Sequence, residues 1–302
     1  MNTVEVTHVS KSFGPIIAVD DLSFAVQRGE IFGLLGPNGA GKTTTIRLIL
    51  DIYKPDAGHI SVLGGEMDEA KKNRIGYMPE DRGLYQDIPL DSVLVYLATL
   101  KGLTQEEARQ RSMAYMERFD LSEHRTKKVK ELSKGMQQKA QIIATLLHNP
   151  ELVIIDEPFS GLDPLNTQIV KELLLDLHQQ GITIIMSTHQ MHQVEELCDR
   201  ILLINNGHSV LYGDLEAIRE DYSGHAVLVK TRGDLPDLPG VVADGKVQGN
   251  GYSRLTLAPE VAPQDILKSL VERGTMIEAF EIAVPTLDEI FIRAVRGEGV
   301  PA

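Results

Sequence analysis

Apolar residues in the first part of the chain form short alternating or continuous stretches that predict β-strands. Val4, Val6 and Val9 are spaced for one strand, and residues 22–26 form another. Residues 31–35 are almost continuously apolar, as in a strand buried in a parallel sheet. A glycine-rich loop at 36–44 and a helical pattern at positions 46, 48, 49 and 52 follow. The order is strand, glycine-rich loop, helix.

A helical period replaces this pattern between about residues 86 and 150. Val93, Leu94 and Leu97 fit one helix, and Thr104 with Glu107 forms a capping box for a second. The second helix covers 105–119 and the third covers 134–147. Strands return at 152–155, 183–186 and 201–204, separated by helices at 164–180 and 189–197. We therefore predict an α/β fold with a parallel-sheet core, an antiparallel β part and a helical subdomain at about 86–150.

The last part of the chain predicts a separate small α+β domain. A short helix near 214–222 closes the first unit, and glycines and prolines then punctuate the sequence. Strands are expected at 226–231, 253–257 and 276–283, and helices at 266–272 and 287–295. The predicted domains are 1–220 and 221–302. No second glycine-rich loop occurs in the sequence, so the chain is not an internal duplication.

Composition narrows the choice of function. The chain has 302 residues and a formal charge of −13, so bulk electrostatic binding to nucleic acid is not expected. A single cysteine, Cys198, excludes a disulfide framework or a cysteine-rich zinc site within one chain. The longest apolar runs are much shorter than the roughly 20 residues of a membrane-spanning helix, and no signal peptide is recognisable. We expect a cytosolic protein that reaches a membrane only through a partner.

The glycine-rich loop carries a phosphate-binding motif. Residues 36–43 match G-x-x-x-x-G-K-[ST], between a predicted strand and a predicted helix. Glycines let backbone N–H groups surround phosphate oxygens, and the helix N-terminus adds positive potential. Lys42 is expected to contact the β- and γ-phosphates, and Thr43 to ligate Mg²⁺. The expected nucleotide-binding residues are Gly36, Pro37, Asn38, Gly39, Ala40, Gly41, Lys42, Thr43 and Thr44.

Two acids end the apolar run 152–155. The carboxyl ends of parallel strands form the edge at which such sheets bind ligands, so Asp156 and Glu157 are expected there. We assign Asp156 to the Mg²⁺ shell and Glu157 to the polarisation of the attacking water. Two solvated acids after a strand would be the simpler interpretation, and the phosphate loop decides against it.

Further segments resemble those of the ATP-binding cassette (ABC) ATPases. Residues 132–136, LSKGM, resemble the LSGGQ signature, with departures at Lys134 and Met136. Phe13 stands where the family places an aromatic ring that stacks on adenine. Residues 75–80 resemble the Q-loop, 160–163 the D-loop and 187–189 the switch-histidine loop. Together these motifs cover about residues 3–220 in the family's order.

One residue of the Q-loop departs from the family's pattern, while the surrounding segment resembles a subgroup. Glu80 replaces the usual glutamine and adds a charge beside Asp156 and Glu157. The segment 77–85, together with Lys134 and Met136, resembles the ATPases of ABC-2-type exporters, such as the NatA- and DrrA-like subunits. Members of that subgroup commonly carry a C-terminal extension resembling residues 220–302.

The resemblance implies how the residues act. ATP lies between the phosphate loop of one subunit and the signature of the other, so a homodimer and the cofactors ATP and Mg²⁺ are expected. Ser133 and Gly135 would bind the γ-phosphate, His189 would contact it, and Asp163 would communicate across the dimer. Lys42, Glu157 and His189 are the expected catalytic residues, and Glu80 an expected ligand-binding one.

The same resemblance implies a location and a membrane partner. The helical subdomain and the loop 80–86 would hold a separate multi-span permease at the cytoplasmic face of the membrane. Export of an ion, a drug or another cargo is the expected function.

Two other functions are weighed against export. Soluble ABC ATPases of translation or DNA repair usually carry two cassettes or a long coiled-coil insert, and the sequence contains neither. A phosphate-loop kinase for small molecules is disfavoured by residues 133–135 and by the loops containing Asp163 and His189.

Overall fold

The structure is a computed structural model that describes residues 1–81, 83–222, 226–246, 251–258 and 260–296. The chain forms two compact units, Met1–Asp214 and Leu215–Ala302. The sequence-based boundary near residue 220 falls inside helix α8, Leu215–Tyr222, which belongs to the second unit.

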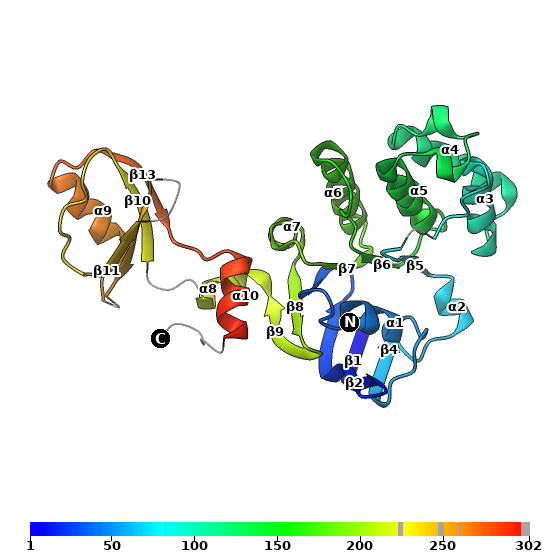
Figure 1. The fold of residues 1–302 in the computed structure, drawn as a ribbon, viewed down its shortest axis with the longest axis horizontal. Coiled ribbons are helices and arrows are strands. Elements are labelled where there is room, and N and C mark those ends of the chain that lie inside the picture. Colours follow the sequence, from blue (N-terminus) through cyan, green and yellow to red (C-terminus); the bar gives the residue numbers. More distant parts are fainter. Residues whose placement is uncertain (82, 223–225, 247–250, 259, 297–302) are drawn as a thin grey trace. The chain divides into compact units, whose positions relative to one another are not determined.

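A six-stranded sheet forms the centre of the first unit (Figure 1). All residues of three of its strands are buried, which explains their nearly continuous apolar sequences. Five strands are parallel, and β9 pairs antiparallel with β8. In spatial order the strands are β5 (Ile75–Met78), β6 (Leu152–Asp156), β7 (Thr183–Thr188), β3 (Ile31–Leu35), β8 (Arg200–Asn205) and β9 (His208–Asp214).

A three-stranded antiparallel sheet packs against this centre. It has the order β2-β1-β4. Buried side chains of both sheets and of helix α1 (Lys42–Ile49) share one hydrophobic core, in which the rings of Phe24 and Phe32 stack at 5.6 Å. The strands are β1 (Asn2–Phe13), β2 (Ile16–Gln27) and β4 (Ala57–Val62). The predicted antiparallel β part is therefore present.

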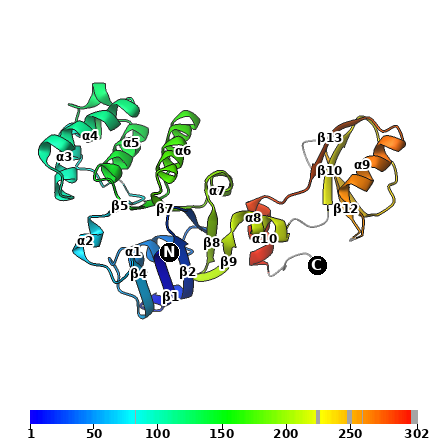
Figure 2. The ribbon, with the colours of Figure 1, turned by 180° about the vertical axis from the view of Figure 1, so that it is seen from behind.

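Three helices lie together in both views of the first unit and form the predicted helical subdomain (Figures 1 and 2). They are α3 (Leu90–Leu100), α4 (Gln105–Arg118) and α5 (Lys134–Leu146). The capping box at Thr104 and Glu107 is confirmed. The other helical segments of this unit are α2 (Glu69–Lys72), η1 (Ser122–His124), η2 (Val129–Glu131), α6 (Pro164–Gln179) and α7 (Met191–Leu197). Among the described residues, we find no helix that combines the length and the apolar character needed to cross a membrane.

The second unit is an antiparallel sheet with helices, as predicted. Its strands have the order β11-β12-β10-β13. Ile266 and Leu270 of α9 belong to the same apolar cluster as Val227 and Leu255 of the sheet. Its elements are α8, β10 (Ala226–Thr231), β11 (Val241–Lys246), β12 (Ser253–Leu257), α9 (Pro263–Glu272), β13 (Ile277–Ile282) and α10 (Leu287–Val295).

Four strands have no counterpart in the sequence-based prediction: β4, β5, β9 and β11. Strands β4 and β9 are mostly exposed or half-buried, so they lack the apolar pattern that marks a buried strand. Backbone pairing with β1 and β8 makes them strands. Strand β5 is only four residues long, and it lies within the segment that we identified by its motif alone.

Strand β6, which is fully buried in the six-stranded sheet, should be highly sensitive to loss of side-chain volume. Ile154 is completely buried, so Ile154→Ala should reduce the free energy of unfolding by about 2–5 kcal/mol through lost burial and a residual cavity. Ile52→Ala provides a matched control, because Ile52 is 56% exposed. Denaturant unfolding followed by circular dichroism measures both variants. Equal losses of stability for the two would contradict the position of β6 in the core.

Candidate functional site

The strand register places several predicted site residues at one edge of the six-stranded sheet. Asp156, at the end of β6, is the register partner of Ser187 on β7. Thr188, the last residue of β7, pairs in register with Leu35, after which the phosphate loop begins. The parallel pairing of β5 and β6 brings Glu80 to the same edge. The edge thus collects side chains that are far apart in the sequence.

The phosphate loop needs glycine at two positions for steric reasons. Gly36 has a φ of 146°, and a Cβ there would lie 2.2 Å from the carbonyl oxygen of Ile204. Gly41 has a φ of 114°, and a Cβ there would lie 2.4 Å from the carbonyl oxygen of Ala18. Both positions combine a backbone conformation that side chains disfavour with a backbone contact that leaves no room. The two glycines therefore let the loop pack closely against the neighbouring backbone.

Lys42 is buried at the first position of α1. Its Nζ donates hydrogen bonds to the carbonyl oxygens of Gly36 at 2.8 Å and Pro37 at 3.2 Å, so the lysine spans its own loop. Burial lowers the pKa of Lys42, while the carboxylates of Glu157, Asp156 and Glu80 act in the opposite direction. Lys42 therefore interacts electrostatically with all three acids.

A pair of hydroxyl groups orients Asp156. Thr43 Oγ1 donates to Asp156 Oδ2 at 2.9 Å, and Ser187 Oγ donates to Oδ1. The aspartate is only 1% exposed, so these bonds offset part of the cost of burying its charge. The predicted Mg²⁺ ligands are thus adjacent. Ser187 was not predicted as a site residue, and its only sequence signal is membership of the motif at 187–189.

Glu157 is held from both sides. Its φ of 54° is uncommon for a residue other than glycine, and its N–H donates to the carbonyl oxygen of Ser187 at 3.0 Å. Thr188 Oγ1 donates to Glu157 Oε2 at 3.3 Å. His189 Nδ1 lies 2.7 Å from Oε1, and the histidine is half-exposed while Glu157 is buried. The predicted catalytic pair is therefore in direct contact.

A cavity of about 270 Å³ opens onto this edge. It contains predicted residues from the phosphate loop together with Glu80, Asp156 and Glu157. Three lining residues were not predicted: Ile16, Ile17 and Ala18, near the start of β2. Their apolar side chains gave no chemical signal in the sequence. The predicted residues that line the cavity are Asn38, Gly39, Gly41, Lys42, Thr43, Thr44, Glu80, Asp156 and Glu157.

Ser133, Gly135 and Asp163 are not among the residues that line this cavity. Ser133 caps α5 by accepting a hydrogen bond from the N–H of Met136. A Cβ at Gly135 would lie 3.9 Å from Leu162 Cδ2, so the signature segment lies beside the D-loop segment. Asp163 caps α6, and hydrogen bonds from the backbone and side chain of Asn166 hold the pKa of Asp163 below its usual value.

Phe13 lies at the end of β1 and is also not among the cavity-lining residues. The ring is 42% exposed and contacts Tyr53 edge-to-face, with the ring centroids 5.2 Å apart. Its remaining exposed surface is available for stacking. Of the other loop residues, Gly36 and Pro37 bind Lys42, and Ala40 is buried.

Comparison with known proteins decides the family. The chain matches the ABC transporter family over residues 19–160 and the C-terminal domain of DrrA1-3-like ATP-binding proteins over residues 213–295. It is 41% identical over 292 residues to the ABC transporter ATP-binding protein YhaQ of Bacillus subtilis, covering 96% of this chain and 97% of YhaQ. The chain belongs to the ABC transporter ATP-binding proteins.

Other ABC proteins extend the likeness. The chain is 32% identical to the Nod factor export ATP-binding protein I of Sinorhizobium fredii, covering 96% of this chain and 85% of that protein. A solved structure of an ATP-binding subunit of an ABC transporter superposes with a TM-score of 0.68 at 34% identity, covering 73% of this chain and 93% of that one. The ABC resemblance inferred from the motifs, the ABC cassette fold and the DrrA-like C-terminal extension are confirmed, and the chain is an ABC ATPase.

Replacement of one carboxylate should separate ATP binding from hydrolysis. Glu157→Gln keeps the shape of the side chain but removes the charge that we expect to polarise the attacking water, so turnover should fall by about 100-fold or more. ATP affinity should change little, because Lys42 and Thr43 are untouched. Glu151→Gln is the matched control, since Glu151 lies just before β6 at the opposite edge and pairs with Arg74. Steady-state hydrolysis and equilibrium ATP binding are measured, and near-normal turnover of Glu157→Gln would contradict the assignment.

Proposed function

We propose that this ABC ATPase powers a membrane exporter through a separate multi-span permease, at the cytoplasmic face of the membrane. The observation that carries the proposal is the gathering of Lys42, Thr43, Asp156 and Glu157 around one cavity. Similarity to a Nod factor export protein over nearly the whole chain supports export. The DrrA-like C-terminal domain extends this likeness beyond the cassette. It favours export over the soluble ABC ATPases of translation or DNA repair.

The residues at the sheet edge fit a Mg²⁺–ATP complex. Mg²⁺ prefers oxygen ligands, and the Thr43 hydroxyl and the Asp156 carboxylate lie 2.9 Å apart at the cavity. When bound, Mg²⁺ supplies positive charge that neutralises phosphate oxygens. Lys42 binds the phosphates as a buried cation, and the N-terminus of α1 adds its dipole. In our proposal, Thr43 and Asp156 hold the metal.

Glu157 is the proposed base for the attacking water. Its burial strengthens its electrostatic effect, and the hydrogen bond from Thr188 fixes the orientation of its carboxylate. His189 contacts the other carboxylate oxygen and is half-exposed, so its ring can turn between Glu157 and a γ-phosphate. Glu80 adds a third carboxylate at the same cavity.

A second copy of the chain is proposed to complete each site. Ser133 is exposed at the N-terminus of α5, and neither Ser133 nor Gly135 lines the cavity formed by Lys42 in the same chain. A helix N-terminus with free N–H groups suits a γ-phosphate bound by another subunit. Asp163 lies on the adjoining segment and would relay contact between the two copies. Two ATP molecules would then join a head-to-tail homodimer.

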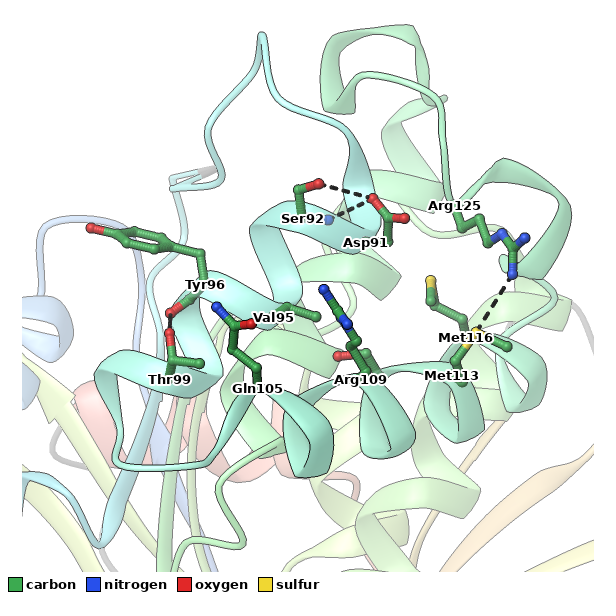
Figure 3. Close-up of a pocket in the computed structure, with 11 residues that line it drawn as sticks. Asp91, Ser92, Val95, Tyr96, Thr99, Gln105, Arg109, Met113, Met116 and Arg125 are labelled. Atoms are coloured by element: carbon green, nitrogen blue, oxygen red, sulfur yellow. Dashed lines mark hydrogen bonds between the residues drawn. The ribbon is translucent and has the colours of Figure 1, made fainter.

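The helical subdomain offers a surface for the permease. Between α3 and α4 lies a pocket of about 480 Å³, into which Arg109 projects from α4 (Figure 3). Arg125 also lines it, and its Nη1 lies 3.8 Å from the weakly accepting Met113 sulfur. Tyr85 and Tyr96 form an exposed edge-to-face pair at 5.9 Å. The pocket also contains one acid, Asp91, and apolar side chains such as Val95 and Met116. Its two guanidinium groups against one carboxylate suit an acidic, amphipathic segment of a protein partner.

Co-purification tests the partner. The chain is produced together with a candidate multi-span permease and purified from detergent-solubilised membranes, and a stable complex with ATP-dependent transport is expected. Recovery of the chain only with ribosomes or DNA would overturn the proposed function.

The docking surface makes a separate prediction. Reversal of both pocket charges, Arg109→Glu with Arg125→Glu, should weaken that complex at least about tenfold, because two charge-assisted hydrogen bonds are lost. The ATPase activity of the isolated chain should stay unchanged. Arg118→Glu makes the same type of charge change on α4 outside the pocket and serves as the control. Equal affinities for the pocket variant and the control would exclude this surface.

A further inference from the structure

Helix α5 buries four polar side chains. Gln138, Lys139, Gln141 and Thr145 are each at most 8% exposed. Burial of such groups is unfavourable unless their hydrogen bonds are made. An apolar residue would fill each position without that constraint. The partners that these four polar groups bind should therefore explain why polar residues occupy these positions.

Gln141 has partners of a particular kind. Its Nε2 donates to the carbonyl oxygen of Pro79 at 2.9 Å and to that of Asp81 at 3.2 Å. One amide group thus bridges the two residues on either side of Glu80. By comparison, Gln138 donates to the carbonyl oxygen of Pro158 at 3.2 Å, and Lys139 to that of Phe119 at 3.0 Å.

The segment that Gln141 holds carries an acid close to two others. Glu80 lines the same cavity as Asp156 and Glu157, and both of those acids are buried. Their like charges repel one another, and Glu80 is itself exposed, so it is free to move toward solvent. Lys42 offsets part of this repulsion, since it interacts with all three carboxylates. A loop that carried Glu80 without an anchor would relax outward, away from the two buried acids.

We propose that Gln141 is a positioning residue that holds Glu80 in the ATP site against the repulsion of Asp156 and Glu157. It acts on the loop backbone and touches neither substrate nor metal. The inference rests on the proposed function, because it assigns Glu80 a role at the ATP site. Gln141 also links that role to the signature segment, since Ser133 and Gln141 lie on one helix about 12 Å apart along its axis.

A double-mutant cycle tests this inference. Gln141→Met keeps the length of the side chain and its burial but removes both donated hydrogen bonds. ATP hydrolysis by the purified full-length chain is measured for wild type, Gln141→Met, Glu80→Gln and the double variant. Gln141→Met should lower kcat about tenfold with little change in KM for ATP, because a small displacement of a site residue reduces the rate strongly.

Two further readouts separate positioning from general destabilisation. With Glu80→Gln the repulsion is absent, so the added effect of Gln141→Met on kcat should shrink to less than about threefold. In the wild-type background, Gln141→Met should also raise the Mg²⁺ concentration needed for half-maximal activity several-fold. Thr145 Oγ1 donates to the carbonyl oxygens of Gln141 at 2.9 Å and Tyr77 at 3.5 Å, but to neither residue beside Glu80. Thr145→Val should therefore leave kcat and the Mg²⁺ dependence unchanged.

The outcomes distinguish this inference from the proposed function. The same loss of kcat in both backgrounds, or no loss in Gln141→Met, would overturn the positioning role while leaving the ATPase intact. A normal melting temperature with low kcat in Gln141→Met would support it, whereas a loss of activity that only parallels unfolding would refute it. A wild-type chain that does not hydrolyse ATP would remove the proposed function and this inference together.

Discussion

Buried charge at the carboxyl edge of the six-stranded sheet constrains the rest of the cassette. Lys42 is the cation that interacts there with Asp156, Glu157 and Glu80. Lys42, Asp156 and Glu157 are almost fully buried. Acids concentrated in this way are stable only where donors and cations surround them. Hydroxyl groups of Thr43, Ser187 and Thr188 supply donors, and the strand register brings them there. The same charge distribution suits a metal-bound triphosphate, because the acids attract the metal cation and Lys42 attracts the phosphates.

Helix α5 connects this edge with two other parts of the mechanism. Its first turn carries Ser133 and Gly135, which lie outside the cavity that they are proposed to complete in a second copy. Its buried face binds backbone carbonyls next to Glu80 and Glu157. Its packing partner α3 carries part of the pocket proposed for the permease. One helix therefore bonds the backbone beside Glu80 and Glu157, the latter the proposed base, and packs against the helix that carries part of the proposed docking pocket.

The sequence predicts the site better than its surroundings, for physical reasons. The phosphate loop, Asp156 and Glu157 are recognisable because their chemistry depends on short contiguous patterns beside apolar strands. The contacts of Ser187 with Asp156 and of Gln141 with Pro79 and Asp81 join segments far apart in the chain, so no local pattern reveals them. Strands β4 and β9 were missed because pairing, not burial, defines them. Ile16, Ile17 and Ala18 cannot be recognised from the sequence, because an apolar residue that lines a nucleotide cavity has no pattern that distinguishes it from other apolar residues.

We propose that this acidic edge binds Mg²⁺–ATP and that a second copy completes the site. An experimental structure of the Glu157→Gln variant with ATP and Mg²⁺ tests it most directly. We expect a dimer with the phosphates against Lys42, the metal between Thr43 and Asp156, and the γ-phosphate against Ser133 and Gly135 of the other copy. A nucleotide bound elsewhere, or a complete site formed within one chain, would contradict the proposed ATP site and its completion by a second copy.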